Sequence, residues 1–92
     1  ENVYPAEVER VLLLPPSVAE AAVIGVPDDK WGEVGRAFVV CRAGQIVSEA
    51  DLLEHCRANL AKFKVPRSAV FVEALPKNDT GKINRQALGN LS

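Results

Sequence analysis

The tripeptide Thr80-Gly81-Lys82 is the segment of this chain best suited to bind an anion. A lysine ammonium on a polar loop suits a phosphate or a carboxylate, and the glycine lets the backbone approach such a ligand closely. The phosphate-binding P-loop needs a glycine five residues before its last glycine and a serine or threonine after the lysine. Pro76 and Ile83 occupy those positions, so the segment is not a P-loop. An exposed loop lysine without a ligand is the alternative.

Two aromatic residues form a second group of candidates. Phe63 stands between Lys62 and Lys64, where a nucleotide base can stack on the ring while the cations contact phosphates. A helix C-terminus with lysines that match its dipole is the other interpretation. Trp31, the only tryptophan in the sequence, is expected in a loop beside Gly32. It either caps the core or lines a ligand tunnel or an interface.

The cysteines and the single histidine do not form a catalytic or metal-binding pattern. His55 and Cys56 are neighbours in an expected helix, and adjacent helical residues do not face each other. Cys56 falls on the apolar stripe of that helix, so we predict a core thiol. The spacing from Cys41 to Cys56 fits neither a zinc motif nor a disulfide scaffold. We expect no metal site in this chain and a reducing, cytoplasmic location.

Length, composition and charge exclude several classes of protein. Ninety-two residues that are 48% hydrophobic and 25% charged fit one small domain rather than a disordered chain. No apolar run approaches the roughly 18 residues of a membrane span. A net charge of −1 argues against a general nucleic-acid binder. Residues 62–92 nevertheless hold six bases and two acids, which indicates either a solvated basic face or a site for a nucleotide or its phosphates.

The elements that must position these residues follow from periodicity and from capping residues. Pro5 suits the first turn of a helix and Pro15-Pro16 ends it. Ser48 is expected to cap the next helix, whose buried stripe reaches Leu60, and Asn84 to cap the last helix. The run 36–42 is apolar at successive positions, which is typical of a strand covered on both faces. The expected order is a helix at 6–14, strands at 18–26 and 36–42, the Ser48 helix, a strand at 69–72 and a helix at 85–88. This order predicts a small α+β domain with an antiparallel or mixed sheet of about three strands covered by helices.

Four segments of the chain resemble, in the same order, the motifs of one protein family. They are residues 1–9 (ENVYPAEVE), 23–28 (VIGVPD), 31–33 (WGE) and 75–83 (LPKNDTGKI). Together they are similar to the C-terminal domain of adenylate-forming enzymes, which include acyl-CoA synthetases, peptide-synthetase adenylation domains and firefly-type luciferases. The resemblance covers essentially the whole chain. The chain also contains no methionine and begins at Glu1, so we expect it to be a piece of a longer protein.

The resemblance implies a mobile lid on a large N-terminal domain that is absent from this chain. That domain would hold ATP, its Mg²⁺ and the carboxylic acid. The lid would close to form acyl-AMP and pyrophosphate, and would then rotate about a hinge just before Glu1 so that a thiol such as that of CoA attacks. The 92 residues alone are expected to be inactive. No nucleic acid and no membrane span are expected among the partners.

The resemblance also implies roles for particular residues. Lys82 matches the lysine that contacts the carboxylate and the α-phosphate during adenylation, with Thr80 and Gly81 shaping its loop. A cation at that position would stabilise the charge of the attacking oxygen and the phosphate.

The second set of implied roles concerns the thiol substrate. Glu1, Asn2 and Trp31 fall where family members line the pantetheine tunnel, and Phe63 and Arg67 fall where some ligases hold the CoA nucleotide. Val65 departs from the pattern, because some relatives carry a basic residue there, and this departure puts the CoA contact in doubt.

The sequences of residues 31–33 (WGE) and 36–40 (RAFVV) resemble those of medium-chain, long-chain or aromatic acid ligases more than those of peptide synthetases. We therefore expect an AMP-forming acid–CoA ligase. The alternatives are an adenylation domain that loads a carrier protein and a non-catalytic nucleotide-binding module.

Overall fold

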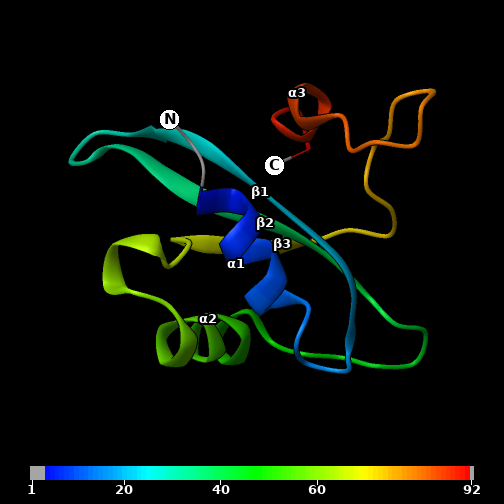
Figure 1. Ribbon diagram of the computed structural model, residues 1–92, viewed down its shortest axis with the longest axis horizontal. Helices are drawn as coiled ribbons and strands as arrows, with labels where there is room; N and C mark the ends of the chain where they lie inside the picture. The colour runs from blue at the N-terminus through cyan, green and yellow to red at the C-terminus, as the bar shows by residue number, and fades with distance from the viewer. Residues whose placement is uncertain (1–3, 92) are drawn as a thin grey trace.

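A three-stranded mixed sheet forms the centre of the fold (Figure 1). The computed structural model describes residues 4–91. Strands β1 (Val18–Asp28) and β2 (Gly32–Cys41) pair antiparallel, and β3 (Ser68–Phe71) joins the other side of β2 in parallel, giving the order β1-β2-β3. The helices of this part of the chain are α1 (Tyr4–Leu12), α2 (Glu49–Asn59), the short 3₁₀ helix η1 (Lys62–Lys64) and α3 (Arg85–Leu88). The predicted α+β domain with about three strands is confirmed, and its sheet is mixed.

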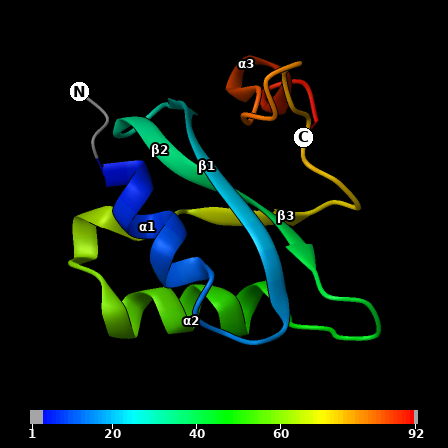
Figure 2. The same cartoon turned by 45° about the vertical axis from the view of Figure 1, so that its right-hand side comes forward.

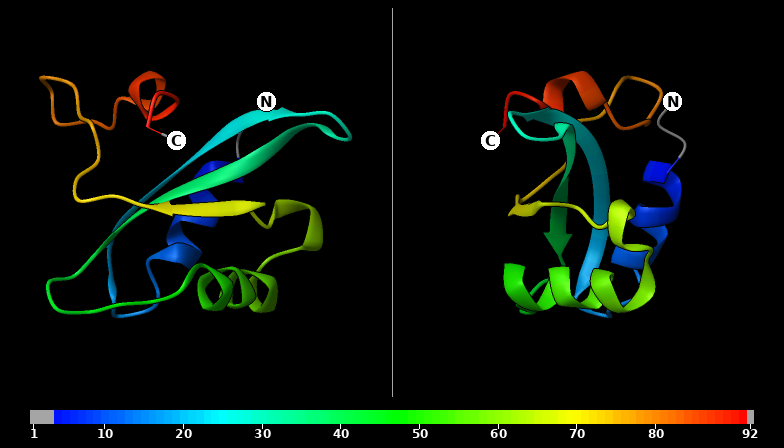
Figure 3. Two further views of the ribbon diagram at one scale, coloured as in Figure 1. Left: turned by 180° about the vertical axis from the view of Figure 1, so that it is seen from behind. Right: turned by 90° about the vertical axis from the view of Figure 1, so that its left-hand side faces the viewer.

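Strand β2 is covered on both faces. Ala37 and Val39 point into a core formed with α1 and α2, to which Leu52 contributes. Phe38 points the other way and packs in a second core with Leu88 of α3. Figures 2 and 3 show the resulting layers, with α1 and α2 on one face of the sheet and α3 on the other. The three consecutive side chains of β2 are fully buried, which confirms the prediction for the run 36–42.

The predicted helix caps are present. The side-chain oxygen of Ser48 accepts a hydrogen bond from the backbone N–H of Asp51 at 3.0 Å, and Asn84 accepts one from Ala87 at 3.1 Å. Each bond satisfies an N–H group that the first helical turn leaves without a partner.

The predicted ends of the first helix and of the hairpin strands were wrong. Helix α1 already ends at Leu12, before the two prolines. The first two strands are longer than expected, because β1 includes Pro27 and β2 begins at Gly32. Pro27 is tolerated since β1 is an edge strand, where a missing N–H costs no ladder bond. The turn is formed instead by Asp28, whose carboxylate accepts the N–H groups of Lys30 and Trp31 at 3.1 and 2.9 Å.

We predict that Phe38→Ala lowers the free energy of unfolding by about 3–5 kcal/mol, because the ring is fully buried between the sheet and α3. Urea unfolding measures this change. Phe63→Ala is the matched control, since Phe63 is 82% exposed and its truncation should change stability by no more than about 0.5 kcal/mol. Equal effects of the two substitutions would contradict the placement of Phe38.

Candidate functional site

Lys82 lies on a short hairpin between β3 and α3. Lys77 and Ile83 pair as an isolated antiparallel bridge, and the N–H of Asn78 donates to the carbonyl of Lys82 at 2.7 Å. The turn is closed by a bond from the N–H of Gly81 to the carbonyl of Asn78 at 2.9 Å, with Gly81 at φ +86°. A side chain at this left-handed position would strain the backbone. Gly81 therefore sets the shape of this turn.

The hairpin presents the Lys82 side chain to solvent. Lys82 and Thr80 are both exposed. Within residues 4–91, no hydrogen bond or ion pair engages the Lys82 ammonium. Below the tip, the N–H of Asn84 donates to the carbonyl of Pro76 at 2.9 Å and closes the base of the hairpin. A charge without a partner on a closed hairpin is well placed to meet an anion supplied from outside this domain.

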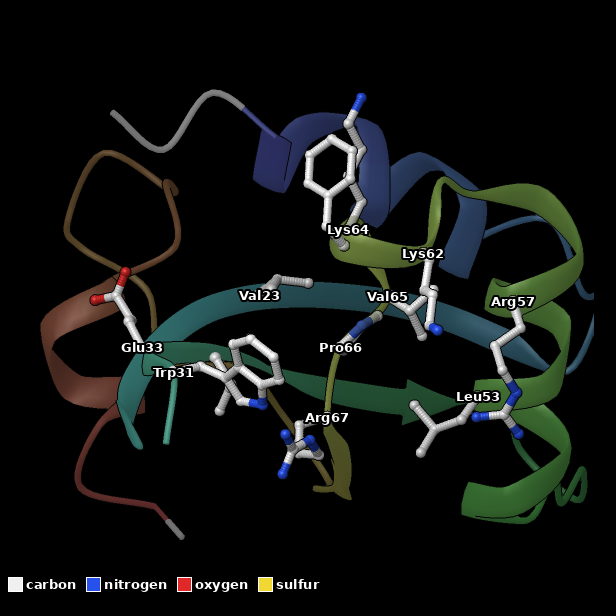
Figure 4. A pocket seen from close by; sticks show the side chains of 13 residues that line it. Val23, Trp31, Glu33, Leu53, Arg57, Lys62, Lys64, Val65, Pro66 and Arg67 are labelled. Atoms are coloured by element: carbon white, nitrogen blue, oxygen red, sulfur yellow. The ribbon is translucent and has the colours of Figure 1, made fainter. Parts of the chain in front are cut away.

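A groove of about 720 Å³ lies between the β1–β2 hairpin, α2 and the segment around η1 (Figure 4). Trp31, Phe63 and Arg67, which the sequence analysis proposed for a thiol substrate, all line this groove. Trp31 is 63% exposed, so the interpretation that it caps the core was wrong. The complete lining is Val23, Trp31, Glu33, Val34, Gly35, Leu53, Arg57, Lys62, Phe63, Lys64, Val65, Pro66 and Arg67.

Arg67 connects the two walls of the groove. Its backbone N–H donates to the carbonyl of Gly35 on β2 at 2.8 Å. Its guanidinium lies 3.9 Å from the carboxylate of Asp28 at the end of β1. In Figure 4 the side chains of Arg67 and Trp31 lie on the same side of the groove. Arg67 therefore contributes both to the shape and to the charge of this surface.

The charge of the groove is mainly positive. Arg57 and Lys62 line it from α2 and from η1, and the sequence analysis had not assigned Arg57 to any site. Arg57 lies in the last turn of α2, one helical turn after Leu53, and this spacing could have assigned it to the same surface. Lys64 also borders the groove, but its ammonium is 2.6 Å from Glu7 of α1 and points away from the centre (Figure 4). The other cations of the lining are Arg57, whose guanidinium pairs with Glu54 at 3.0 Å, Lys62 and Arg67.

The groove and the Lys82 hairpin lie at opposite ends of the domain. In Figure 1 the hairpin (orange) lies at the upper right, whereas η1 and the β1–β2 turn lie at the left, and Figure 3 shows the same separation from behind. The structure thus does not bring Lys82 together with Trp31, Phe63 or Arg67. Glu1 and Asn2, the other proposed contacts of the thiol substrate, lie outside the described residues.

The family model of the AMP-binding enzyme C-terminal domain matches residues 7–82, which include the groove and end at Lys82. The chain belongs to this family. The expectation drawn from the four ordered motifs is confirmed.

Curated relatives of this C-terminal domain are named as CoA ligases. A 3-[(3aS,4S,7aS)-7a-methyl-1,5-dioxo-octahydro-1H-inden-4-yl]propanoyl:CoA ligase of Mycobacterium tuberculosis is 56% identical over 98% of the chain. A 2-succinylbenzoate–CoA ligase of Bacillus cereus is 52% identical over 99% of it. The chain spans only 18% of the length of either relative.

Solved structures contain the same domain. A fatty acyl CoA synthetase of Mycobacterium tuberculosis matches 96% of the chain with a TM-score of 0.85 and 50% identity, over 17% of its own length. The ATP-bound MatB of Rhodopseudomonas palustris matches 96% with a TM-score of 0.90 and 42% identity, over 18% of its length.

His55 and Cys56 take structural positions in α2. The Nε2 atom of His55 lies 2.8 Å from the carbonyl oxygen of Val11, and Cys56 is fully buried as predicted. Burial raises the pKa of the Cys56 thiol, and Arg57 offsets part of that rise. Across residues 4–91, no cluster of three or more His, Cys, Asp or Glu side chains is placed to hold a metal ion. No helix in that range is long and apolar enough to cross a membrane.

We predict that iodoacetamide at pH 8 alkylates Cys41 before Cys56 in the folded domain. Cys41 is partly exposed and Cys56 is buried. A raised pKa also leaves less of the reactive thiolate at a given pH. Mass spectrometry of timed samples measures the order, and urea-unfolded protein, in which both thiols react, is the control. Alkylation of Cys56 first would contradict its burial.

Proposed function

We propose that this chain is the C-terminal domain of an AMP-forming acid–CoA ligase. Family membership and the names of the relatives support the ligase class. The observation that carries the proposal is the exposed Lys82 ammonium, which stands on a closed hairpin without a partner within residues 4–91. Such a cation is suited to an anionic substrate held by the large N-terminal domain of the same polypeptide.

In the first half-reaction a carboxylate oxygen attacks the α-phosphorus of ATP, and the bond to pyrophosphate breaks. Negative charge builds up on the oxygens around the α-phosphorus. Lys82 would lie between the carboxylate and the α-phosphate when the C-terminal domain closes on the large domain. A fixed cation stabilises the transition state there because it needs little reorganisation as the charge develops. Gly81 closes the turn of the hairpin that presents it, and Thr80 is proposed to help shape this loop.

In the second half-reaction the CoA thiol attacks the acyl carbonyl carbon, and the bond to the AMP oxygen breaks. The groove supplies what the CoA nucleotide requires. Phe63 offers an exposed ring for the adenine, and Lys62 and Arg67 offer cations for the phosphates. Trp31, which lines the groove, is proposed to contact the pantetheine arm, and Glu1 and Asn2 are proposed to continue that passage. Val65 leaves one position without the basic side chain that some relatives have.

The groove favours free CoA over a carrier protein as the acceptor. A carrier-bound pantetheine arm lacks the adenosine and its additional phosphate, so it has no use for an exposed ring surrounded by cations. The arrangement of Phe63, Lys62 and Arg67 therefore fits CoA better. A non-catalytic nucleotide-binding module is disfavoured because it would not need a second anion-binding surface at the opposite end.

The last parts of the proposal concern the Mg²⁺ ion that accompanies ATP and the location of the enzyme. The described carboxylates of this domain form no cluster suited to Mg²⁺, so the metal that accompanies ATP is assigned to the large domain and no step here depends on it. A cytoplasmic location is retained on the cysteine pattern of the sequence. The identity of the acid depends on the pocket of the large domain.

The role of Lys82 predicts that Lys82→Ala in the full-length enzyme lowers ATP–pyrophosphate exchange by about 10²–10³-fold, the usual cost of removing one such contact. Thioester formation from supplied acyl-adenylate and CoA should stay near the wild-type rate. Lys77→Ala is the matched control on the same hairpin, because its ammonium pairs with Glu20 rather than standing free. Undiminished exchange in the Lys82 variant would refute the assignment.

The proposed role of the groove predicts a separate effect on the KM for CoA. Phe63→Ala should raise the KM for CoA by roughly 5–150-fold, because stacking of a base on an aromatic ring contributes about 1–3 kcal/mol. Steady-state kinetics with varied CoA measure this change, and pyrophosphate exchange should be unaltered. Phe71→Ala is the control, since Phe71 is partly exposed and does not line the groove. An unchanged KM in the Phe63 variant would remove the ring from the CoA site.

A further inference from the structure

Glu9 of α1 and Arg85 of α3 meet on the outer edge of the sheet. Arg85 donates from Nη1 to Glu9 Oε2 at 2.9 Å and from Nη2 to Glu9 Oε1 at 3.3 Å. Both side chains also bind the backbone of Val23 in the middle of β1. Glu9 Oε2 accepts the N–H of Val23 at 2.8 Å, and the Val23 carbonyl accepts from Arg85 Nη1 at 2.9 Å. We name this group of three residues the edge clamp.

The edge clamp replaces a missing neighbouring strand. Strand β1 is at the edge of the sheet, so its outward-facing N–H and C=O groups need partners from elsewhere. Glu9 and Arg85 provide one acceptor and one donor for Val23 and neutralise each other. The Glu9 side chain is only 16% exposed, which sets this pair apart from ordinary surface ion pairs. Two parallel charge-assisted bonds also fix the orientation of the guanidinium.

The clamp acts on the segment that carries Lys82. Arg85 follows Lys82 by three residues and begins α3, directly after the base of the hairpin. The hairpin is closed by its own backbone bonds, so its direction depends on where its base is held. Leu75, Ile83 and Leu88 hold the base of the hairpin and α3 by apolar contact in or against the second core. Apolar contacts are not directional, whereas the hydrogen bonds of Arg85 are.

A second ion pair at the hairpin provides a contrast. Lys77 Nζ lies 3.2 Å from Glu20 Oε1, with side chains that are 44% and 42% exposed. Exposed pairs of this kind contribute little, and within residues 4–91 neither side chain is hydrogen-bonded to the sheet backbone. Removing it deletes one charge pair from the same hairpin without loosening the edge clamp.

From this arrangement we infer that Glu9 and Arg85 are positioning residues that hold the Lys82 hairpin in the direction needed for adenylation. The inference rests on the proposed function, in which Lys82 contacts the reacting oxygens. It predicts that loss of the Glu9 or Arg85 side chain damages the first half-reaction alone, because Arg85 begins the helix that follows the Lys82 hairpin and neither side chain lines the CoA groove. Val23 is the clamp residue that does line the groove, and it is left unchanged. A displacement of about 1 Å in a reacting group can cost on the order of 10²-fold in rate.

The test uses the full-length enzyme with Arg85→Gln, Glu9→Gln and Lys77→Gln. We expect Arg85→Gln and Glu9→Gln to lower pyrophosphate exchange by about 10–10²-fold, with thioester formation from supplied acyl-adenylate unchanged. Arg85→Lys, which keeps a charge but not the two-pronged geometry, should be intermediate. Lys77→Gln should match the wild type in both assays. Hydrogen exchange should show faster exchange at the amides of residues 77–85 in the two clamp variants only.

A double variant separates positioning from general stability. If the clamp acts through Lys82, Arg85→Gln should cause no further loss of exchange in a Lys82→Ala background, because residues that act as one unit are not additive. Wild-type exchange in Arg85→Gln, or equal losses in both half-reactions, would overturn the inference. Wild-type exchange in Lys82→Ala would instead overturn the proposed function itself.

Discussion

The burial of β2 on both faces is the constraint on which the rest of this domain depends. Ala37 and Val39 hold the core beneath α1 and α2, and Phe38 holds the core beneath α3. The first core fixes α2 and, through it, one wall of the groove. The second fixes the helix that follows the Lys82 hairpin. A single strand therefore links the two proposed functional surfaces, because neither core can move without disturbing the other side of the sheet.

This linkage gives one rigid unit two distinct surfaces. At one end, Lys82, which has no partner within residues 4–91, projects from a tight hairpin and suits a brief contact with a small anionic centre. At the other end, Phe63, Trp31 and three cations surround an open groove, which suits a long substrate with a base and several phosphates. An enzyme that presents first one end and then the other can use the same domain in both half-reactions. The edge clamp holds the Lys82 hairpin in a fixed direction relative to the sheet.

The features that are local in sequence were predictable. The cap residues Ser48 and Asn84, the buried run of β2 and the loop position of Lys82 follow from patterns of a few residues. The parallel pairing of β2 with β3 was left open, because it joins segments some thirty residues apart. The exposure of Trp31 also depends on tertiary structure, since the same tryptophan is compatible with a core or a groove. The edge clamp joins Arg85 to Glu9, which lie 76 positions apart in the sequence. No local sequence pattern predicts such a contact.

The alternating use of the two surfaces is tested most directly by the rates at which acetic anhydride modifies Lys82 and Lys62 in the full-length enzyme. Mass spectrometry measures these rates. With ATP and a non-reacting acid analogue, Lys82 should be protected and Lys62 should react as in the free enzyme. With a stable acyl-adenylate analogue and CoA, the pattern should reverse, with Lys62 protected and Lys82 reactive. Equal modification of both lysines in the two states would contradict the alternating use of the two surfaces.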